Sequence, residues 1–276
     1  MDRKGIAQET LKIQQSGYYE INGRRIDISS MQKASEKNSV LIVPDEGVRI
    51  VEECKALKPP LSTPVASYTI VNQSTVQAVL EMSIAGNHPG VLNFASAKNP
   101  GGGFLGGAMA QEEALAASSG LYNTLLRHGT YYRVNCDCGT MMYTDHAIYS
   151  PGVVFFRDSD YKLLEKPVTA SVLTLPAVNM GQVILKGEDT GRAKTVMLNR
   201  MRLSLAIFAK QKNRNLILGA YGCGVFRNDP ADVAKWWKIL LEDEGYGRFF
   251  YQIVFAILDR SKTQANISVF NRILLG

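Results

Sequence analysis

The chain has 276 residues, of which 46% are hydrophobic and 20% are charged, and this composition predicts a soluble globular protein that forms one domain over residues 1–276. Its longest apolar stretches have the length of strands and its first ten residues lack the apolar core of a secretory signal, so we expect no membrane span and a cytoplasmic protein. The net charge of +6 suits a polyanionic partner, but the basic residues are scattered and exclude no class of function.

Residues 1–38 are predicted to form an accessory segment of one helix and one hairpin. Gln8 to Gln15 has helical periodicity, and Tyr18 to Ile28 alternates around Asn22-Gly23, a dipeptide typical of hairpin turns. We expect this N-terminal extension to flank the main sheet.

From Ser39 onward, apolar runs rich in β-branched residues alternate with segments of helical period, which is typical of an α/β protein. The predicted strands are Val40 to Val43, Ala66 to Val71, Gly90 to Phe94, Ala147 to Phe156, Ser171 to Pro176, Leu216 to Ala220 and Gln252 to Asp259. The predicted helices are Ser74 to Ala85, Gln111 to Leu126, Thr190 to Gln211, Pro230 to Asp243 and Ser268 to Leu274. This order indicates helices on both faces of a sheet of six or more strands.

A glycine-dense loop connects the predicted strand that ends near Asn93 with the helix that begins near Gln111. Ligands of α/β sheets bind beyond the carboxyl ends of strands, and five glycines in the segment 101–107 let backbone N–H groups turn toward an anion. The loop therefore predicts a phosphate-bearing ligand.

Two other phosphate-binding loops are disfavoured. Gly101 to Gly106 formally matches the dinucleotide fingerprint of the Rossmann fold, but Ala95 to Pro100 separates it from the strand and no acidic residue ends a following strand at the expected distance. No Gly-Lys-Ser or Gly-Lys-Thr follows any glycine of the loop, which argues against a Walker A motif.

The triplet Gln111-Glu112-Glu113 opens the helix after this loop. Acidic residues in a first helical turn often serve only as partners of the helix dipole. Beside a loop that binds diphosphate, however, a carboxylate is placed to protonate a departing oxygen and then to deprotonate water, as cleavage of a glycosidic bond requires.

A second glycine loop, Gly219 to Phe226, follows another predicted strand and precedes a helix that Asn228-Asp229 caps and Pro230 begins. Its backbone N–H groups could bind the same diphosphate, while Phe226 packs against a sugar or base. The alternative is a tight turn with a core phenylalanine. Cys223 has no histidine near it in sequence, so a nucleophilic role is disfavoured.

The other candidate ligands indicate no metal site. Four cysteines are too few for a disulfide framework, Cys136-x-Cys138 lacks a second ligand pair, and the three histidines share no ligand spacing with these cysteines. Trp236-Trp237 lies within a predicted helix, where one ring can pack in the core. We expect free thiols, no metal or cofactor, and no direct binding of nucleic acid.

The triplet Gly101-Gly102-Gly103, followed after a short spacer by Gln111-Glu112-Glu113, resembles the signature of the microbial-type poly(ADP-ribose) glycohydrolases, a branch of the macrodomain superfamily. This spacing is more specific than a lone glycine fingerprint. The resemblance extends through Tyr143 to Asp158 and Gly219 to Pro230 and covers most of the chain after about Val40. It implies a three-layer α/β/α macrodomain with a mixed central sheet that binds ADP-ribose.

The same resemblance implies roles for individual residues. Glu113 would be the catalytic acid and base, which protonates the oxygen that leaves the anomeric carbon and then activates water, while Glu112 would position ribose hydroxyls. Asn99 would contact the distal ribose and Phe226 would hold it in place. The residues implied to bind ADP-ribose are Asn99, Gly101, Gly102, Gly103, Gln111, Gly222, Cys223, Gly224, Val225 and Phe226.

The resulting hypothesis is a monomeric glycosidase that hydrolyses the ribose–ribose bonds of poly(ADP-ribose) carried by modified proteins and releases ADP-ribose. One alternative is a non-catalytic ADP-ribose-binding macrodomain, against which the Gln111-Glu112-Glu113 triplet argues. The other is a macrodomain hydrolase of mono-ADP-ribosylated substrates, which only a comparison of substrates can separate from the first.

Overall fold

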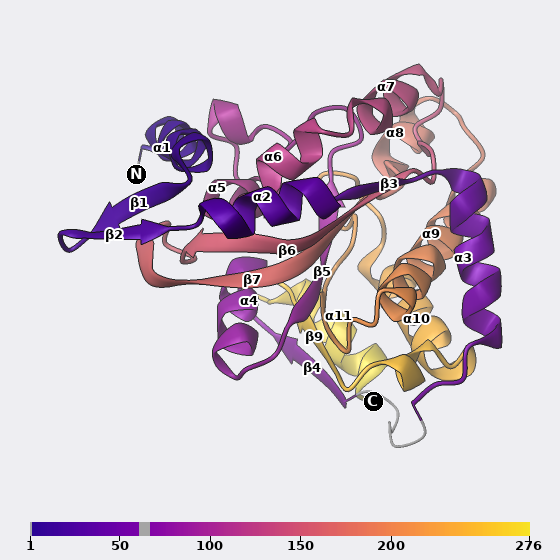
Figure 1. The fold of residues 1–276 in the computed structure, drawn as a ribbon. Helices are drawn as coiled ribbons and strands as arrows, with labels where there is room; N and C mark the ends of the chain where they lie inside the picture. Colours follow the sequence, from indigo (N-terminus) through magenta and orange to yellow (C-terminus); the bar gives the residue numbers. More distant parts are fainter. Residues whose placement is uncertain (1, 61–66) are drawn as a thin grey trace.

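The computed structural model describes residues 2–60 and 67–276, and its N-terminal extension contains the predicted helix and hairpin (Figure 1). The elements of this extension are α1 (Arg3–Ser16), β1 (Tyr18–Ile21), β2 (Arg24–Asp27) and α2 (Ser29–Asn38). The α1 helix begins where the Asp2 side chain accepts a hydrogen bond from the Gly5 N–H at 3.0 Å. The hairpin turns at Asn22 and Gly23, whose φ angles of 52° and 71° fit the turn predicted from this dipeptide.

A mixed sheet of seven strands lies at the centre of the molecule, which confirms the predicted fold class. Its strands are β3 (Val40–Ile42), β4 (Ser67–Val71), β5 (Pro89–Ala95), β6 (Ala147–Arg157), β7 (Leu163–Pro176), β8 (Asn215–Leu218) and β9 (Gln252–Ala256). Their order across the sheet is β3-β6-β7-β5-β8-β9-β4, and β6 pairs antiparallel with β3 and β7 while the other pairs are parallel. Ala66, where one strand was expected to begin, lies outside the described residues.

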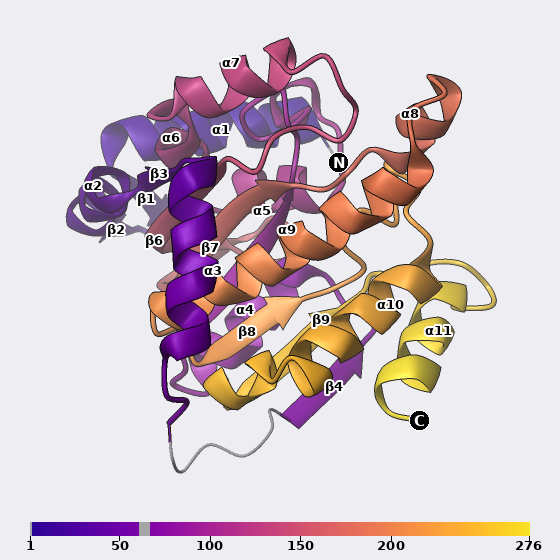
Figure 2. The ribbon, with the colours of Figure 1, turned by 90° about the vertical axis from the view of Figure 1, so that its right-hand side faces the viewer.

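Helices cover both faces of the sheet and complete three layers; in Figure 2, α3, α9 and α10 lie in front of the sheet. One face carries α4 (Thr75–Ile84), α5 (Gln111–Ser118), α6 (Leu121–Leu126) and α7 (Gly129–Asp137), and the other carries α3 (Pro44–Ala56), α8 (Met180–Leu185), α9 (Thr190–Lys210), α10 (Pro230–Lys238) and α11 (Ala265–Leu274). Side chains along β8 point alternately to the two faces of the sheet, so this strand contributes to the hydrophobic core on each face. Ile217 packs with Leu115 of α5, whereas Leu216 and Leu218 pack in the cluster that contains Trp237 of α10.

The single helix predicted across α5 and α6 is wrong, because the chain breaks between them to pair with β6. Ser119 forms a bridge with Phe155, and the Gly120 N–H donates to the Val154 carbonyl at 2.9 Å. A Cβ atom on Gly120 would lie 1.7 Å from Gln32 Oε1, so a larger residue there would displace the Gln32 amide. Helical periodicity carries no information about such a tertiary contact.

Four helices, α2, α3, α7 and α8, were not expected from the sequence. The α3 helix has a recognisable start, with Pro44 at its first position and Asp45 and Glu46 in its first turn. The predicted start of α10 is confirmed, since Asp229 accepts a hydrogen bond from the Ala231 N–H at 2.8 Å. That helix continues as a π-helical turn, η2 (Ile239–Asp243).

The carboxyl ends of β5, β7 and β8 meet at one edge of the sheet, because these strands are parallel. The glycine loops after β5 and β8 therefore lie at the same edge, as predicted from their positions in the sequence. None of the helices in residues 2–60 and 67–276 is both long enough and apolar enough to cross a membrane.

Candidate active site

Glu112 is buried beneath the first glycine loop. Its side chain is 3% exposed, one oxygen accepts a hydrogen bond from the Ser96 N–H at 2.6 Å, and the other accepts from Asn93 Nδ2 at 3.3 Å. Burial raises the pKa of Glu112 to about 8, although these donors and the Gly101 backbone favour the charged form. Glu112 is therefore largely protonated near neutral pH.

Glu113 is half-buried, and its carboxylate lies against the glycine triplet. Oε1 accepts a hydrogen bond from the Gly103 N–H at 2.8 Å, and Oε2 accepts one from the Ala110 N–H at 3.0 Å. Gly102 has a φ of +60°, and a Cβ atom there would lie 2.3 Å from Glu113 Oε1. Only glycine fits this position, so the triplet and the second glutamate of the sequence motif form one structural unit.

Gln111 fixes the start of α5 to the end of β5. Its Oε1 accepts a hydrogen bond from the Phe94 N–H at 2.8 Å, and its Nε2 donates to the Leu92 carbonyl at 2.8 Å. Both ends of the amide are thus engaged by the strand. The expectation that Gln111 binds ligand stays a prediction, and the hydrogen bonds seen here position the two glutamates that follow it.

The first glycine loop turns tightly around Ser96 and Asn99. Ser96 Oγ accepts hydrogen bonds from the N–H groups of Lys98, at 3.3 Å, and of Asn99, at 3.1 Å. The Asn99 carbonyl in turn accepts from the Gly102 N–H at 3.0 Å. Asn99 itself is exposed beside the loop. Gly101 has a φ of +66° and leaves room for the Tyr122 ring, 3.1 Å from where its Cβ atom would be.

The second glycine loop follows the neighbouring strand, because β8 pairs with β5. Gly222 has a φ of +73°, and a Cβ atom there would lie 2.6 Å from Asn228 Nδ2. That amide donates to the carbonyls of Val178, at 2.8 Å, and of Gly222, at 3.0 Å, and so fixes the loop against the end of β7. Gly224 and Val225 project outward, and Val225 is 81% exposed.

Cys223 is half-buried in this second loop and is unsuited to nucleophilic chemistry. Burial raises the pKa of its thiol to about 12, so the reactive thiolate is scarce at neutral pH. That the second loop binds ligand stays a prediction.

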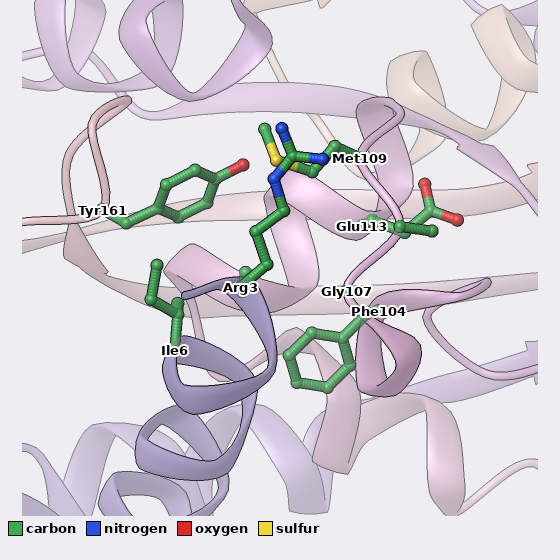
Figure 3. Close-up of a pocket in the computed structure, with 9 residues that line it drawn as sticks. Arg3, Ile6, Phe104, Gly107, Met109, Glu113 and Tyr161 are labelled. Carbon is green, nitrogen blue, oxygen red and sulfur yellow. The ribbon is translucent and has the colours of Figure 1, made fainter. Parts of the chain in front are cut away.

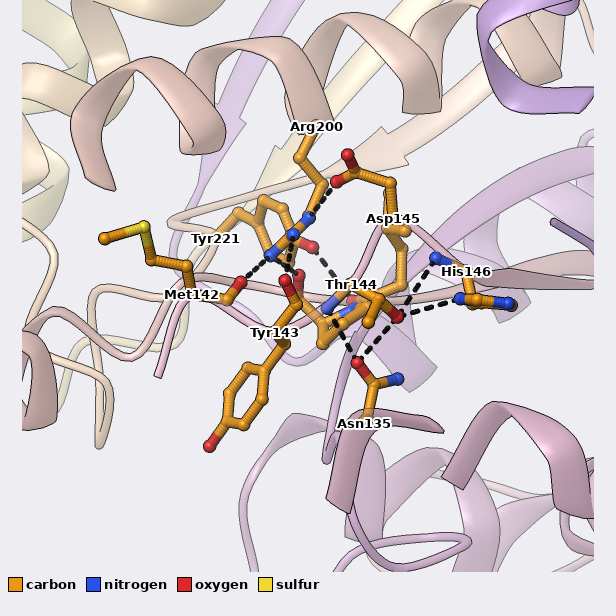
Figure 4. Close-up of polar contacts among 10 residues, drawn as sticks. Asn135, Met142, Tyr143, Thr144, Asp145, His146, Arg200 and Tyr221 are labelled. Atoms are coloured by element: carbon orange, nitrogen blue, oxygen red, sulfur yellow. Dashed lines mark hydrogen bonds and ion pairs between the residues drawn. The ribbon is translucent and has the colours of Figure 1, made fainter. Parts of the chain in front are cut away.

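Phe226 ends the second loop beside Tyr143, with the two ring centroids 6.1 Å apart. Tyr143 lies in the connection from α7 to β6 and has a left-handed φ of 57°. The Tyr143 ring points away from the polar cluster that holds its backbone (Figure 4). The pair presents two aromatic rings at the sheet edge on which both glycine loops lie.

Arg200 of α9 organises that polar cluster, which sequence reasoning missed. The guanidinium of Arg200 is buried; it donates to Asp145 Oδ1 at 2.9 Å, to the Met142 carbonyl at 2.7 Å and to the Pro176 carbonyl at 3.0 Å, with a longer contact of 3.4 Å to the Tyr143 carbonyl (Figure 4). The available signal was the position of Arg200 on the helix face that Ala193, Met197 and Ser204 bury, because a buried cation requires partners.

Asn135 and Thr144 anchor the same connection from its other side. Asn135 Oδ1 accepts hydrogen bonds from the Thr144 N–H at 2.8 Å and from the Thr144 hydroxyl at 2.9 Å. The connection that carries Tyr143 is therefore fixed by α7 as well as by α9. In the part of the chain that the structure describes, no three His, Cys, Asp or Glu side chains gather closely enough to hold a metal ion.

Comparison with known proteins gives one consistent set of relatives. The family described as the catalytic domain of microbial-type PARG matches residues 7–158, a range that includes most of the N-terminal extension. The structure of poly(ADP-ribose) glycohydrolase from Thermomonospora curvata is 36% identical in sequence, with 98% of each chain covered and a TM-score of 0.92. Its complex with the inhibitor ADP-HPD has a TM-score of 0.90.

The enzyme from Deinococcus radiodurans in complex with ADP-ribose is 36% identical, with 93% of this chain and 98% of that chain covered and a TM-score of 0.82. Among curated proteins there is no significant match.

Proposed function

This chain belongs to the microbial-type poly(ADP-ribose) glycohydrolases, and we propose on that premise that it hydrolyses ribose–ribose bonds of poly(ADP-ribose) with Glu113 as general acid and base. The observation that carries the assignment is the contact of the Glu113 carboxylate with the Gly103 and Ala110 N–H groups. The half-buried side chain lies at the loop where a bound diphosphate would place the distal ribose. Glu112, one residue earlier, is enclosed by protein.

In this reaction Glu113 first gives a proton to the substrate and then takes a proton from water. Protonated Glu113 donates to the ribose oxygen as its bond to the anomeric carbon breaks, and the carbon gains oxocarbenium character. The Glu113 carboxylate then takes a proton from water while the water oxygen bonds to the same carbon. The Gly103 and Ala110 N–H groups hold the carboxylate in place between these steps.

We propose that the two glycine loops bind the diphosphate through backbone N–H groups, and that Asn99 and Phe226 contact the distal ribose. Support comes from the adjacent positions of β5 and β8 and from the exposure of Asn99 and Gly224. That Glu112 positions ribose hydroxyls stays a prediction, because its carboxyl group is buried and both oxygens accept hydrogen bonds from the protein. ADP-ribose itself is bound by the Deinococcus relative.

The test compares the wild type with Glu113→Gln and Glu113→Ala on defined poly(ADP-ribose), by following released ADP-ribose. Loss of the acid and base should lower kcat by about 10²- to 10⁴-fold, while calorimetry should show that ADP-ribose still binds. Two variants are needed because the amide NH2 that Glu113→Gln introduces would face one of the two N–H donors. Glu52→Gln, an exposed change of the same charge on α3, serves as the control.

Binding without release by the wild type would identify a non-catalytic reader instead. Release from mono-ADP-ribosylated protein but not from polymer would identify the third hypothesis. The single domain of residues 1–276, the monomeric state and the protein-borne substrate stay predictions, which light scattering and cleavage of modified proteins would test.

A further inference from the structure

A pocket lies beside Glu113, between α1, the loop that contains the 3-10 turn η1 (Phe104–Gly106) and the turn from β6 to β7 (Figure 3). Its volume is about 10 Å³, room for about one water molecule. Ile6 and Phe104 contribute apolar surface, and Arg3, Met109 and Tyr161 come together above them (Figure 3). The catalytic mechanism described above uses none of these five side chains.

The N-terminal extension and the β6–β7 turn are held together as the walls of this pocket. Arg157 pairs with Glu9 of α1 at 2.6 Å and donates to the Tyr161 carbonyl at 2.8 Å. The Thr10 hydroxyl donates to the Ala117 carbonyl of α5 at 2.7 Å. These bonds tie α1 and the turn to the helix that carries Glu113, so the walls keep a fixed relation to the catalytic carboxylate.

The pocket has a positive rim. Arg3 is exposed, and none of the ion pairs among the described residues includes it. Burial raises the pKa of Tyr161, the guanidinium groups of Arg3 and Arg260 oppose that rise, and the Glu113 carboxylate adds to it. Arg3 thus offers a cation beside the Tyr161 ring in the lining of the pocket, an arrangement that suits an anion attached to an aromatic group.

The substrate has such a group, a phosphate attached to a nucleoside, on the leaving side of the scissile bond. The oxygen that Glu113 protonates belongs to the ribose of the next polymer unit, and that ribose also carries an adenine and a 5′-phosphate. An aromatic or thioether surface packs against a base, and a guanidinium pairs with a phosphate.

We propose that the surface formed by Arg3, Met109 and Tyr161 binds the nucleotide on the leaving side of the scissile bond. Arg3 contacts its phosphate, and Met109 and Tyr161 contact its adenine. The base lies against the mouth of the pocket, since the pocket itself holds about one water. This inference rests on the proposed function, and it gives the N-terminal extension a role in selecting polymer over smaller leaving groups.

The test measures kcat/KM on two substrates: poly(ADP-ribose), and the phenyl glycoside of ADP-ribose, whose leaving group has neither adenine nor phosphate. Arg3→Gln should lower kcat/KM for polymer about tenfold, mainly through KM, and leave the glycoside unchanged. Tyr161→Asn should act in the same direction, and asparagine tolerates the φ of 64° at that position. Lys12→Gln, the same charge change at an exposed position of α1, is the control.

The outcomes separate this inference from the proposed function. A wild type that cleaves neither substrate would overturn the proposed function itself. Equal polymer cleavage by wild type and Arg3→Gln would refute the leaving-side subsite alone. An equal loss on both substrates, or the same loss in Lys12→Gln, would also refute it, because the effect would then be structural or a matter of overall charge.

Discussion

Replacing Arg200 with methionine should destabilise the protein by about 3–6 kcal/mol, because two buried carbonyls each lose a hydrogen bond from a charged donor, worth about 1.5–3 kcal/mol, while Asp145 is half exposed and can be hydrated. The variant leaves the Met142 and Pro176 carbonyls without their donor and leaves Asp145 without its cation. Methionine fills similar volume, so the loss reports the hydrogen bonds rather than a cavity. For a chain of 276 residues, this change corresponds to a fall in Tm of roughly 7 °C.

Arg202→Met is the matched control, two residues along the same helix. Arg202 pairs with Glu244 at 2.6 Å, but both side chains are partly exposed, so its loss should cost at most about 1 kcal/mol. Urea unfolding followed by circular dichroism measures both variants. Equal destabilisation by the two changes would refute the conclusion that Arg200 is a buried structural cation.

The same variant should also weaken binding of ADP-ribose at a temperature where it remains folded. Arg200 donates hydrogen bonds to the Met142 and Tyr143 carbonyls, which flank the Cα atom of Tyr143. The Tyr143 ring lies beside Phe226. Calorimetry of Arg200→Met and Tyr143→Phe separates the two contributions. Weaker binding in the first and normal binding in the second would show that backbone position, and not the Tyr143 hydroxyl, determines the effect.

Two further predictions concern the catalytic loop and the buried glutamate. Gly102→Ala should abolish hydrolysis, because its Cβ atom would lie 2.3 Å from Glu113 Oε1, whereas Gly106→Ala, with nothing within 4 Å, should keep most activity in the same polymer assay. Burial raises the pKa of Glu112 from 4.5 to about 8, so the folded state keeps a proton that the unfolded chain releases; the free energy of unfolding should fall as pH rises between these values. Glu112→Gln should flatten this slope in urea unfolding at about pH 5 and about pH 8, and an unchanged slope would contradict the raised pKa.

The sheet could be predicted from the sequence because its strands contain short apolar runs rich in β-branched residues, and six of the seven lie within a few residues of their predicted bounds. The seventh, β7, was expected to begin at Ser171 but begins at Leu163, because its first half is partly exposed and pairs with β6 rather than forming an apolar run. The helices were predicted less completely. The break between α5 and α6 depends on hydrogen bonds to β6, and α8 is six residues long, too short for a periodic pattern to indicate. Tertiary contacts define the first of these features and short length hides the second, whereas α3 was missed although Pro44 at its first position marks its start in the sequence.

In the candidate site, too, the features within one segment could be predicted and those that depend on tertiary contacts could not. The glycine triplet and the glutamates lie within one segment, so their spacing alone brought Gly103 and Glu113 together, and the structure places them in contact. Arg200 and Tyr143 are 57 residues apart and come from different elements. No spacing rule links them, and only the fold shows that one holds the backbone of the other.

Helix geometry explains why two adjacent glutamates can have different tasks. Consecutive residues of an α-helix point about 100° apart. With Gln111 fixed to β5, that rotation turns Glu112 toward Ser96 and Asn93 and turns Glu113 toward Gly103. Glu112 is enclosed, and burial keeps it protonated to a higher pH than a carboxyl group in water. Glu113 is only half-buried, so it can exchange protons with substrate and water. The division of roles therefore depends on the anchored start of α5, and Gln111→Ala should disturb both glutamates although it removes no reacting group.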